Sequence, residues 1–164
     1  MSIKKYLCIT GANGFIVNHI VDHQGVNEFS VKVLTRQRCV QRHYPQNIER
    51  VTGDLLDTES LHNFLEPDSV VVNLAYGISQ PRDINMRAAR NLADSCRKIG
   101  VKRLVHCSTA VVAGRVKDDV VTEGTECQPF TEYERTKLKI ENLFSDQLIN
   151  VCDLVILRPT AVFG

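Results

Sequence analysis

Tyr133 and Lys137 stand four residues apart in a segment with a helical pattern. In a helix this spacing places the phenol and the ammonium on one face, one turn apart. A free tyrosine has a pKa near ~10, and an adjacent cation favours the phenolate, so such a pair can act as an acid or base nearer neutral pH. Tyr-x-x-x-Lys pairs also arise by chance, and a core or surface role is the alternative.

A second pattern that could do chemistry is a glycine turn near the N-terminus. Residues 11–14 read Gly-Ala-Asn-Gly and stand between a short apolar strand pattern and a helical pattern that begins at Phe15. Glycines there permit a tight turn and let backbone N–H groups approach a pyrophosphate, with help from the positive end of the helix dipole. The order of strand, turn and amphipathic helix favours a phosphate-binding loop over a plain turn.

The elements that must position these residues alternate along almost the whole chain. This alternation predicts an α/β fold, a doubly wound parallel sheet of about six strands in a three-layer αβα Rossmann arrangement. Right-handed crossovers give the strand order 3-2-1-4-5-6, with a ligand crevice at the carboxyl ends of the strands. The predicted strands are residues 6–10, 31–35, 48–52, 70–74, 104–108 and 151–157, and the predicted helices are residues 15–24, 58–65, 83–99 and 131–148.

Composition limits the classes of function. The chain has 164 residues, room for one domain, with 43% hydrophobic residues, 24% charged residues and a formal net charge of +1. This charge balance argues against nucleic acid and anionic membranes as partners. No apolar run approaches the ~20 residues that span a bilayer, and residues 1–6 lead into a strand rather than form a signal peptide. Six cysteines without a C-x-x-C pair fit reduced thiols, so we expect a cytoplasmic protein without a metal site.

The order of several motifs is similar to that of the extended short-chain dehydrogenase/reductase family, the nucleotide-sugar epimerase and dehydratase group. Residues 10–16 resemble its T-G-A-x-G-F-I turn, although Val17 replaces a third glycine that normally lets the helix pack close to the sheet. The remaining matches are residues 53–55 with G-D-L, residues 73–75 with H-L-A (Asn73 replaces His), residues 108–114 with S-S/T-A-x-V-Y-G, the Tyr-x-x-x-Lys pair, and residues 158–164 with R-P-x-x-V-Y-G.

The resemblance implies an NAD(P)-dependent enzyme that acts by hydride transfer. Tyr133 would exchange a proton with the substrate hydroxyl or carbonyl, and Thr109 would orient and polarise that oxygen. Lys137 would favour the phenolate and hold the nicotinamide ribose. Val17 is expected to push the first helix outward or force a local shift, and so to weaken cofactor binding. The implied cofactor-binding residues are Gly11, Asn13, Gly14, Phe15, Ile16, Arg36, Asp54, Leu55, Leu74, Ala75, Tyr133, Lys137 and Pro159.

Arg36 follows the second predicted strand directly. An NAD-preferring member would place an acid near Thr35 to accept hydrogen bonds from the adenosine ribose. A guanidinium pairs well with a 2′-phosphate and gains nothing from a bare hydroxyl. We therefore predict NADP(H) over NAD(H), and a solvated surface arginine is the alternative.

Ala110 and Val111 follow Thr109, where the family's 4,6-dehydratases carry an acidic pair, and this argues against dehydration. The resemblance leaves epimerase or 4-keto reductase chemistry on a nucleotide-activated sugar, or a steroid- or flavonol-type keto reductase. A non-catalytic NADP(H)-sensing or scaffolding domain stays open as another class.

Full-length members of the family continue beyond this part with a small substrate-binding domain. We therefore expect residues 1–164 to be the NAD(P)-binding domain of a longer protein, which turns over poorly by itself. The resemblance also implies a homodimer formed through the helices at residues 83–99 and 131–148.

Overall fold

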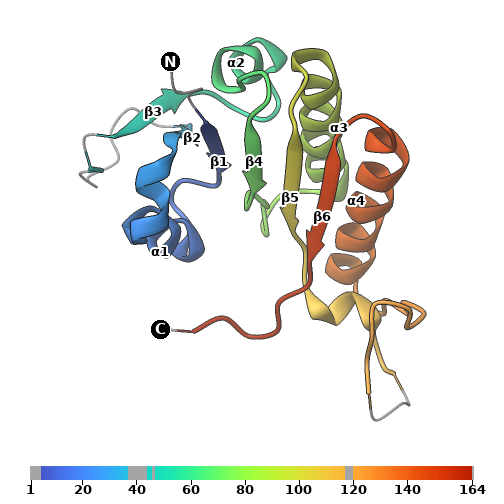
Figure 1. Ribbon diagram of the computed structural model, residues 1–164. Coiled ribbons are helices and arrows are strands. Elements are labelled where there is room, and N and C mark those ends of the chain that lie inside the picture. The colour runs from blue at the N-terminus through green and yellow to red at the C-terminus, as the bar shows by residue number, and fades with distance from the viewer. Residues whose placement is uncertain (1–4, 37–43, 46, 117–119, 164) are drawn as a thin grey trace.

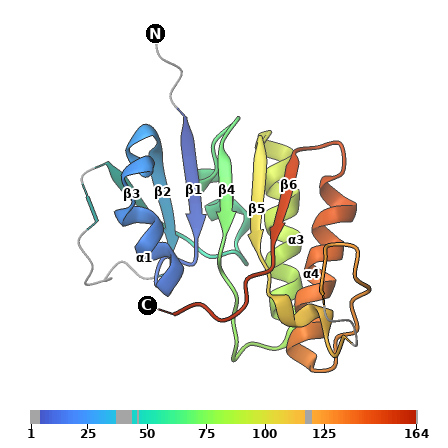
Figure 2. The same ribbon diagram turned by 60° about the horizontal axis from the view of Figure 1, so that its bottom comes forward.

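The centre of the molecule is a six-stranded sheet in which every neighbouring pair of strands is parallel, in the order β3-β2-β1-β4-β5-β6 (Figures 1 and 2). It is seen in a computed structural model that describes residues 5–36, 44–45, 47–116 and 120–163. This confirms the predicted Rossmann fold. The strand order reverses between β1 and β4, and in open parallel sheets ligands bind at such a switch point, outside the carboxyl ends of the strands.

All predicted strands and helices occur, with shifts of one or two residues at their ends. The strands are β1 (Tyr6–Thr10), β2 (Ser30–Thr35), β3 (Ile48–Thr52), β4 (Val70–Asn73), β5 (Arg103–Cys107) and β6 (Asp153–Leu157). The helices are α1 (Phe15–Asp22), α2 (Thr58–Phe64), α3 (Arg82–Ile99) and α4 (Glu132–Leu148), with the short 3-10 helices η1 (Gln24–Glu28) and η2 (Ala110–Ala113). Among the described residues no helix is both long and apolar enough to cross a membrane.

Two hydrophobic cores lie on opposite faces of the sheet. Alternate residues of a strand point to opposite faces, so Leu7 and Ile9 of β1 enter one core and Cys8 enters the other. The first core lies under α1, over β1, β2 and β3. The second lies under α2, α3 and α4, and Figure 2 shows α3 behind β5 and β6, with α4 next to it beyond β6. Its fully buried large side chains include Leu61, Phe64, Leu92, Leu104, Phe144 and Leu148.

Two helix boundaries are set by local caps. α1 ends at Asp22 rather than near Gln24, because the His23 backbone closes the helix and its imidazole accepts a hydrogen bond from the following η1 turn. α4 begins one residue after Thr131, whose side chain accepts from the Glu134 backbone N–H while the Glu134 carboxylate accepts from the Thr131 N–H. This reciprocal capping box fixes the start of the helix that carries the Tyr-x-x-x-Lys pair.

Val17, which stands where the family has a glycine, is fully buried. It belongs to the α1 core together with Leu7, Ile9 and Val31. The valine therefore supplies apolar contact between α1 and the sheet.

Candidate active site

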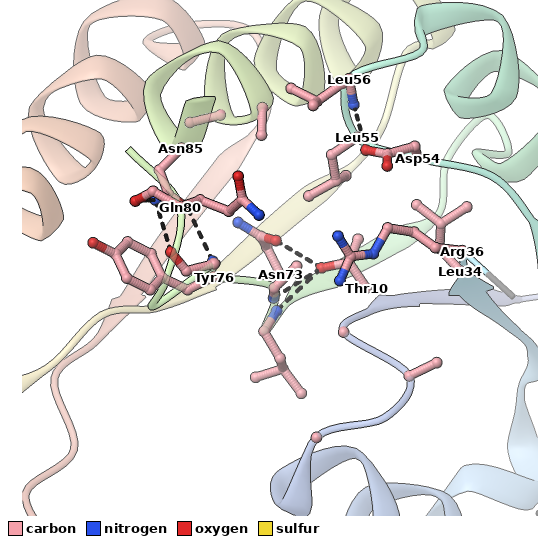
Figure 3. A pocket seen from close by; sticks show the side chains of 18 of the residues that line it. Thr10, Leu34, Arg36, Asp54, Leu55, Leu56, Asn73, Tyr76, Gln80 and Asn85 are labelled. Atoms are coloured by element: carbon pink, nitrogen blue, oxygen red, sulfur yellow. Dashed lines mark hydrogen bonds between the residues drawn. The ribbon is translucent and has the colours of Figure 1, made fainter. Parts of the chain in front are cut away.

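A cavity of about 360 Å³ lies at the carboxyl ends of β1 to β4, beside the start of α3 (Figure 3). It occupies the edge of the sheet at which the crevice was expected. Tyr76, Gln80, His106 and Ile140 lie in its wall together with the glycine turn. The predicted cofactor-binding residues that line it are Gly11, Asn13, Gly14, Arg36, Asp54, Leu55, Leu74 and Ala75.

The glycine turn approaches the end of β4 more closely than a side chain would allow. Gly11 has a φ of +80°, and a Cβ there would lie 3.0 Å from the Leu74 carbonyl carbon and 3.1 Å from the Ala75 nitrogen. The Gly14 N–H donates to the Gly11 carbonyl at 2.8 Å and closes the turn. Gly14 is the N-cap of α1, and no side chain in the described part of the chain caps this helix, so its first backbone N–H groups remain available to a ligand.

A buried hydrogen-bond network joins the ends of β1, β4 and β5 below this turn. The Thr10 hydroxyl donates to Asn73 Oδ1 at 2.6 Å and accepts from the backbone N–H groups of Leu74 at 3.2 Å and Ala75 at 3.3 Å. Asn73 Nδ2 lies 3.1 Å from His106 Nδ1. Because Asn73 Oδ1 already accepts from Thr10, its amide nitrogen faces His106 and donates to it. The three side chains thus hold the strand ends at a fixed separation.

His106 completes the network from inside the core. Its Nδ1 accepts from Asn73, so the neutral ring carries its proton on Nε2, and that atom has no hydrogen-bond partner within the described part of the chain. Burial lowers the pKa of His106 to about 3, and the nearby Lys137 charge acts in the same direction. The ring also packs edge-on against Phe144, with the ring centroids 4.9 Å apart. His106 is therefore a neutral, buried side chain of the cavity wall.

The opposite end of the cavity is formed by the residues that follow β2 and β3. Arg36 is exposed and lies among the lining side chains in Figure 3. The Asp54 carboxylate accepts from the Leu56 N–H at 2.9 Å, so it shapes its own loop. The Leu55 carbonyl accepts from Asn91 Nδ2 of α3 at 3.0 Å. These bonds fix the loop after β3 against α3.

The three predicted catalytic residues lie beside the end of β5. Tyr133 is in the first turn of α4 and is 40% exposed, whereas Lys137, one turn later, is only 3% exposed. Lys137 Nζ donates to the Cys107 carbonyl at 2.7 Å, and burial lowers the pKa of its ammonium. The Thr109 hydroxyl accepts from the Val111 N–H at the start of η2. None of the three belongs to the described residues that line the cavity.

Tyr76 connects the cavity with this group. The residue lines the cavity. Its ring meets the Tyr133 ring edge-on, at 5.3 Å between centroids and 85° between planes, and has Lys137 Nζ 5.0 Å from its centroid. The loop that carries it is fixed by Asn85 of α3, whose amide donates to the Gly77 carbonyl at 3.0 Å and accepts from the Gly77 N–H at 2.9 Å.

The other predicted cofactor-binding residues lie outside the cavity wall. The Pro159 carbonyl accepts from the Ala110 N–H at 2.8 Å, so the segment after β6 runs beside the end of β5. Phe15 is exposed and Ile16 half-buried in the first turn of α1. In the described ranges no group of three or more His, Cys, Asp or Glu side chains could hold a metal ion.

Sequence reasoning did not single out several residues that shape this site, among them Tyr76, His106 and Tyr44. Tyr76 and His106 lie in the cavity wall. The Tyr44 hydroxyl donates to the Ala12 carbonyl at 3.0 Å and braces the glycine turn. Tyr76 had a signal, because it follows a matched motif directly.

Comparison with known proteins gives a consistent family. Residues 7–164 match the model of the "NAD dependent epimerase/dehydratase family". Over 166 residues the chain is 28% identical to an N-acetyl-alpha-D-glucosaminyl-diphospho-ditrans,octacis-undecaprenol 4-epimerase of Escherichia coli, with 95% of the chain and 48% of that relative covered. It is also 28% identical over 167 residues to sterol demethylase protein B of Methylococcus capsulatus, with 95% of the chain and 51% of that relative covered.

Among solved structures, the chain resembles the UDP-glucose 4-epimerase of Thermus thermophilus in complex with NAD. The TM-score is 0.78 at 25% identity, over 94% of this chain and 54% of that one. The chain thus spans about half the length of the relatives that it matches.

Proposed function

Because the chain belongs to the NAD dependent epimerase/dehydratase family, we propose that it is the cofactor-binding part of an NAD(P)-dependent oxidoreductase or epimerase that acts on a nucleotide-activated sugar. The observation that carries this proposal is the placement of two features at one edge of the sheet. The glycine-turn cavity reaches Tyr76, and the ring of Tyr76 contacts both Tyr133 and Lys137. The substrate-binding part would be supplied by residues outside these 164, since the relatives are about twice as long.

The residues present fit a dinucleotide. A Cβ at Gly11 would crowd the Leu74 carbonyl, so the glycine keeps backbone and turn close, and the uncapped first turn of α1 offers N–H groups to an anion. Gly11, Gly14 and the start of α1 at Phe15 and Ile16 would hold the pyrophosphate. The adenosine would lie toward Arg36, Asp54 and Leu55, and the nicotinamide ribose toward Leu74, Ala75, Lys137 and Pro159, with Asn13 at the mouth of the turn.

The side chains at the end of β5 supply the proton chemistry of the proposal. Tyr133 exchanges a proton with the reacting hydroxyl or carbonyl of the substrate. Its side chain is exposed and is therefore accessible to a substrate. Thr109 donates a hydrogen bond to the same oxygen and polarises it. Lys137, one turn after Tyr133 on α4, would hold the nicotinamide ribose through its ammonium. A bound nicotinamide supplies the hydride acceptor or donor that this proton transfer accompanies.

Arg36 supports NADP(H) as the preferred cofactor. It lines the cavity directly after β2, and the sequence there offers no acid for a ribose hydroxyl. The Thermus thermophilus relative was solved with NAD, so NAD(H) is the competing cofactor. Calorimetric titration with NADPH and NADH should give a lower Kd for NADPH, and Arg36→Ala should remove most of that difference while it leaves the Kd for NADH nearly unchanged. A preference for NADH in the parent chain contradicts this assignment.

The substrate class is supported by the epimerases among the relatives and by Ala110 and Val111 after Thr109, where a dehydratase carries acids. A keto reductase or dehydrogenase of sterols is the second candidate. It is favoured by a sterol-4-alpha-carboxylate 3-dehydrogenase of Candida albicans, 27% identical to the chain over 188 residues, and by the sterol demethylase protein of Methylococcus capsulatus, whose identity to the chain equals that of the undecaprenol-linked sugar epimerase. Turnover of UDP-sugars against 3-hydroxysterols, measured with a protein that contains both halves, separates the two.

Tyr133→Phe tests whether the domain is catalytic. In a protein with both halves the variant should lose at least about 100-fold in turnover, because the proton donor is gone, and keep its NADPH affinity. At ~100 times its Kd, NADPH should still stabilise the variant by about 2.7 kcal/mol in thermal unfolding. Tight cofactor binding without turnover in the parent protein would instead support the sensing or scaffolding alternative.

A further inference from the structure

The ammonium of Lys137 is enclosed by the protein. Only 3% of the residue is exposed, Nζ donates to the Cys107 carbonyl at 2.7 Å, and the face of the Tyr76 ring lies 5.0 Å from it. An ammonium carries three donors, and the Cys107 carbonyl takes one of them. A ligand hydroxyl can reach the remaining donors only if the side chain that covers them moves away.

Tyr76 is the residue in the path from the cavity to this ammonium. It lines the cavity, whereas Lys137 and Tyr133 are not among the described residues that do so, and its ring contacts both. The backbone of its loop is fixed through the paired hydrogen bonds between Asn85 and Gly77. The ring can therefore move by side-chain rotation while the loop stays in place.

We propose that Tyr76 is a gating residue that covers Lys137 in the free protein and turns away when a dinucleotide binds, which brings the ammonium into the cofactor cavity. The identity of the ligand rests on the proposed function, whereas the covering of Lys137 rests on the contacts alone. The cation–π contact with Lys137 and the edge-on contact with Tyr133 hold the ring in the closed position. A ribose that hydrogen-bonds to Nζ replaces the first contact with a charge-assisted hydrogen bond.

The covering is measurable without any cofactor. Reductive methylation with formaldehyde, followed by mass spectrometry, reports how accessible each lysine amine is, with exposed Lys139 of the same helix and buried Lys32 of β2 as internal references. Lys137 should be methylated slowly in the parent chain and at least about fivefold faster in Tyr76→Ala, because the ammonium then meets water. Tyr76→Phe keeps the ring and should react like the parent, and Ile78→Ala, at an exposed position of the same loop, is the matched control.

Two outcomes of this labelling overturn the covering. Either Lys137 stays as slow in Tyr76→Ala as in the parent, or it is already as fast as Lys139 in the parent. If Lys32 also becomes reactive in Tyr76→Ala, the variant has loosened globally, and Tyr76→Leu, which keeps an apolar side chain without the ring, replaces it in the comparison.

The gate also predicts a difference between two ligands. Adenosine 2′,5′-bisphosphate occupies only the adenosine end of the cavity, so its Kd should be equal in the parent and in Tyr76→Ala. NADPH must open the gate in the parent, so its Kd should fall about three- to tenfold in Tyr76→Ala, since a ligand that binds a minor state has its affinity reduced by the population of that state. A weaker NADPH affinity in the variant makes Tyr76 a direct contact and overturns the gate. If neither ligand binds the parent, the proposed function fails, and the lysine labelling still decides on the covering.

Discussion

His106 shows how a single buried residue supports the geometry of the site. Its neutral ring accepts a hydrogen bond from the Asn73 amide group. Asn73 in turn accepts one from the Thr10 hydroxyl, and that hydroxyl accepts one from the backbone at the end of β4. A charged ring would have to donate through both nitrogens, and Nδ1 faces the amide hydrogens of Asn73. The strand ends therefore depend on an imidazole that stays neutral, and burial enforces this by lowering its pKa to about 3.

This depressed pKa predicts a specific pH dependence of stability. Between about pH 6.5 and pH 3 the unfolded chain binds a proton at His106 that the folded chain does not, so this contribution is fully present above pH 6.5 and is lost as the pH falls. The free energy of unfolding should decrease by about 1.4 kcal/mol per pH unit from this residue alone. His106→Gln and His106→Asn should both show a shallower slope in urea unfolding between pH 6 and pH 4 than the parent chain. An unchanged slope contradicts the assignment.

At the level of individual residues, the sequence allowed the motifs to be predicted but not the residues that contact them. Residues 73–75 were matched to a family stretch, but the next residue, Tyr76, was not singled out, because its ring acts on Tyr133 and Lys137, which are distant in the sequence. The contact between Asn73 and His106 is likewise invisible before the strands β4 and β5 are paired in register. Long-range contacts of this kind follow from the fold, whereas the spacing of two residues on one helix follows from the sequence alone.

At the scale of elements, strands and helices were predictable because their periodicities differ. The ends of a helix were not predictable wherever a side-chain cap determines them. β3 has its predicted bounds, whereas α1 stops early at the His23 cap. The turn between β1 and α1 depends on Gly11, because this position imposes two structural requirements. It needs a positive φ, and it needs empty space beside Leu74.

These two demands can be separated with a second glycine. Gly100, which caps α3, has the same φ of +80°, and apart from its own chain neighbours no atom of the described chain lies within 4 Å of a Cβ built there. Gly100→Ala should cost about 1 kcal/mol for the left-handed backbone alone. Gly11→Ala should cost at least about 1 kcal/mol more, because its Cβ also meets the Leu74 carbonyl carbon at 3.0 Å, and it should abolish NADPH binding. Urea unfolding and calorimetry of both variants measure this, and equal losses of stability would show that the close approach contributes nothing.

At the scale of the whole molecule, the sheet is covered unequally. The face toward α2, α3 and α4 carries a continuous core across the whole sheet, from β3 to β6, whereas the α1 core reaches only from β3 to β4. On the α1 face of β6, Val155 is 37% and Leu157 50% exposed. The expectation of helices over both faces is therefore met fully on one face and over half of the other. The strand pattern could not show this, because it indicates which residues are apolar but not which of them a helix covers.

The unequal cover predicts that apolar side chains on the two faces of β5 and β6 contribute differently to the free energy of unfolding. Replacing Val155 and Leu157 together by threonine puts a β-branched side chain, which suits a strand, at both positions. It removes apolar area that is already partly hydrated, so it should cost less than about 1 kcal/mol. Leu104→Ala on β5 is the matched control on the other face, where the side chain is fully buried, and it should cost about 2–5 kcal/mol. Urea unfolding of the three proteins gives the comparison. If the double variant loses as much stability as Leu104→Ala, the outer face of β6 is buried in solution, and a repeat at lower protein concentration would show whether a second copy of the chain buries it.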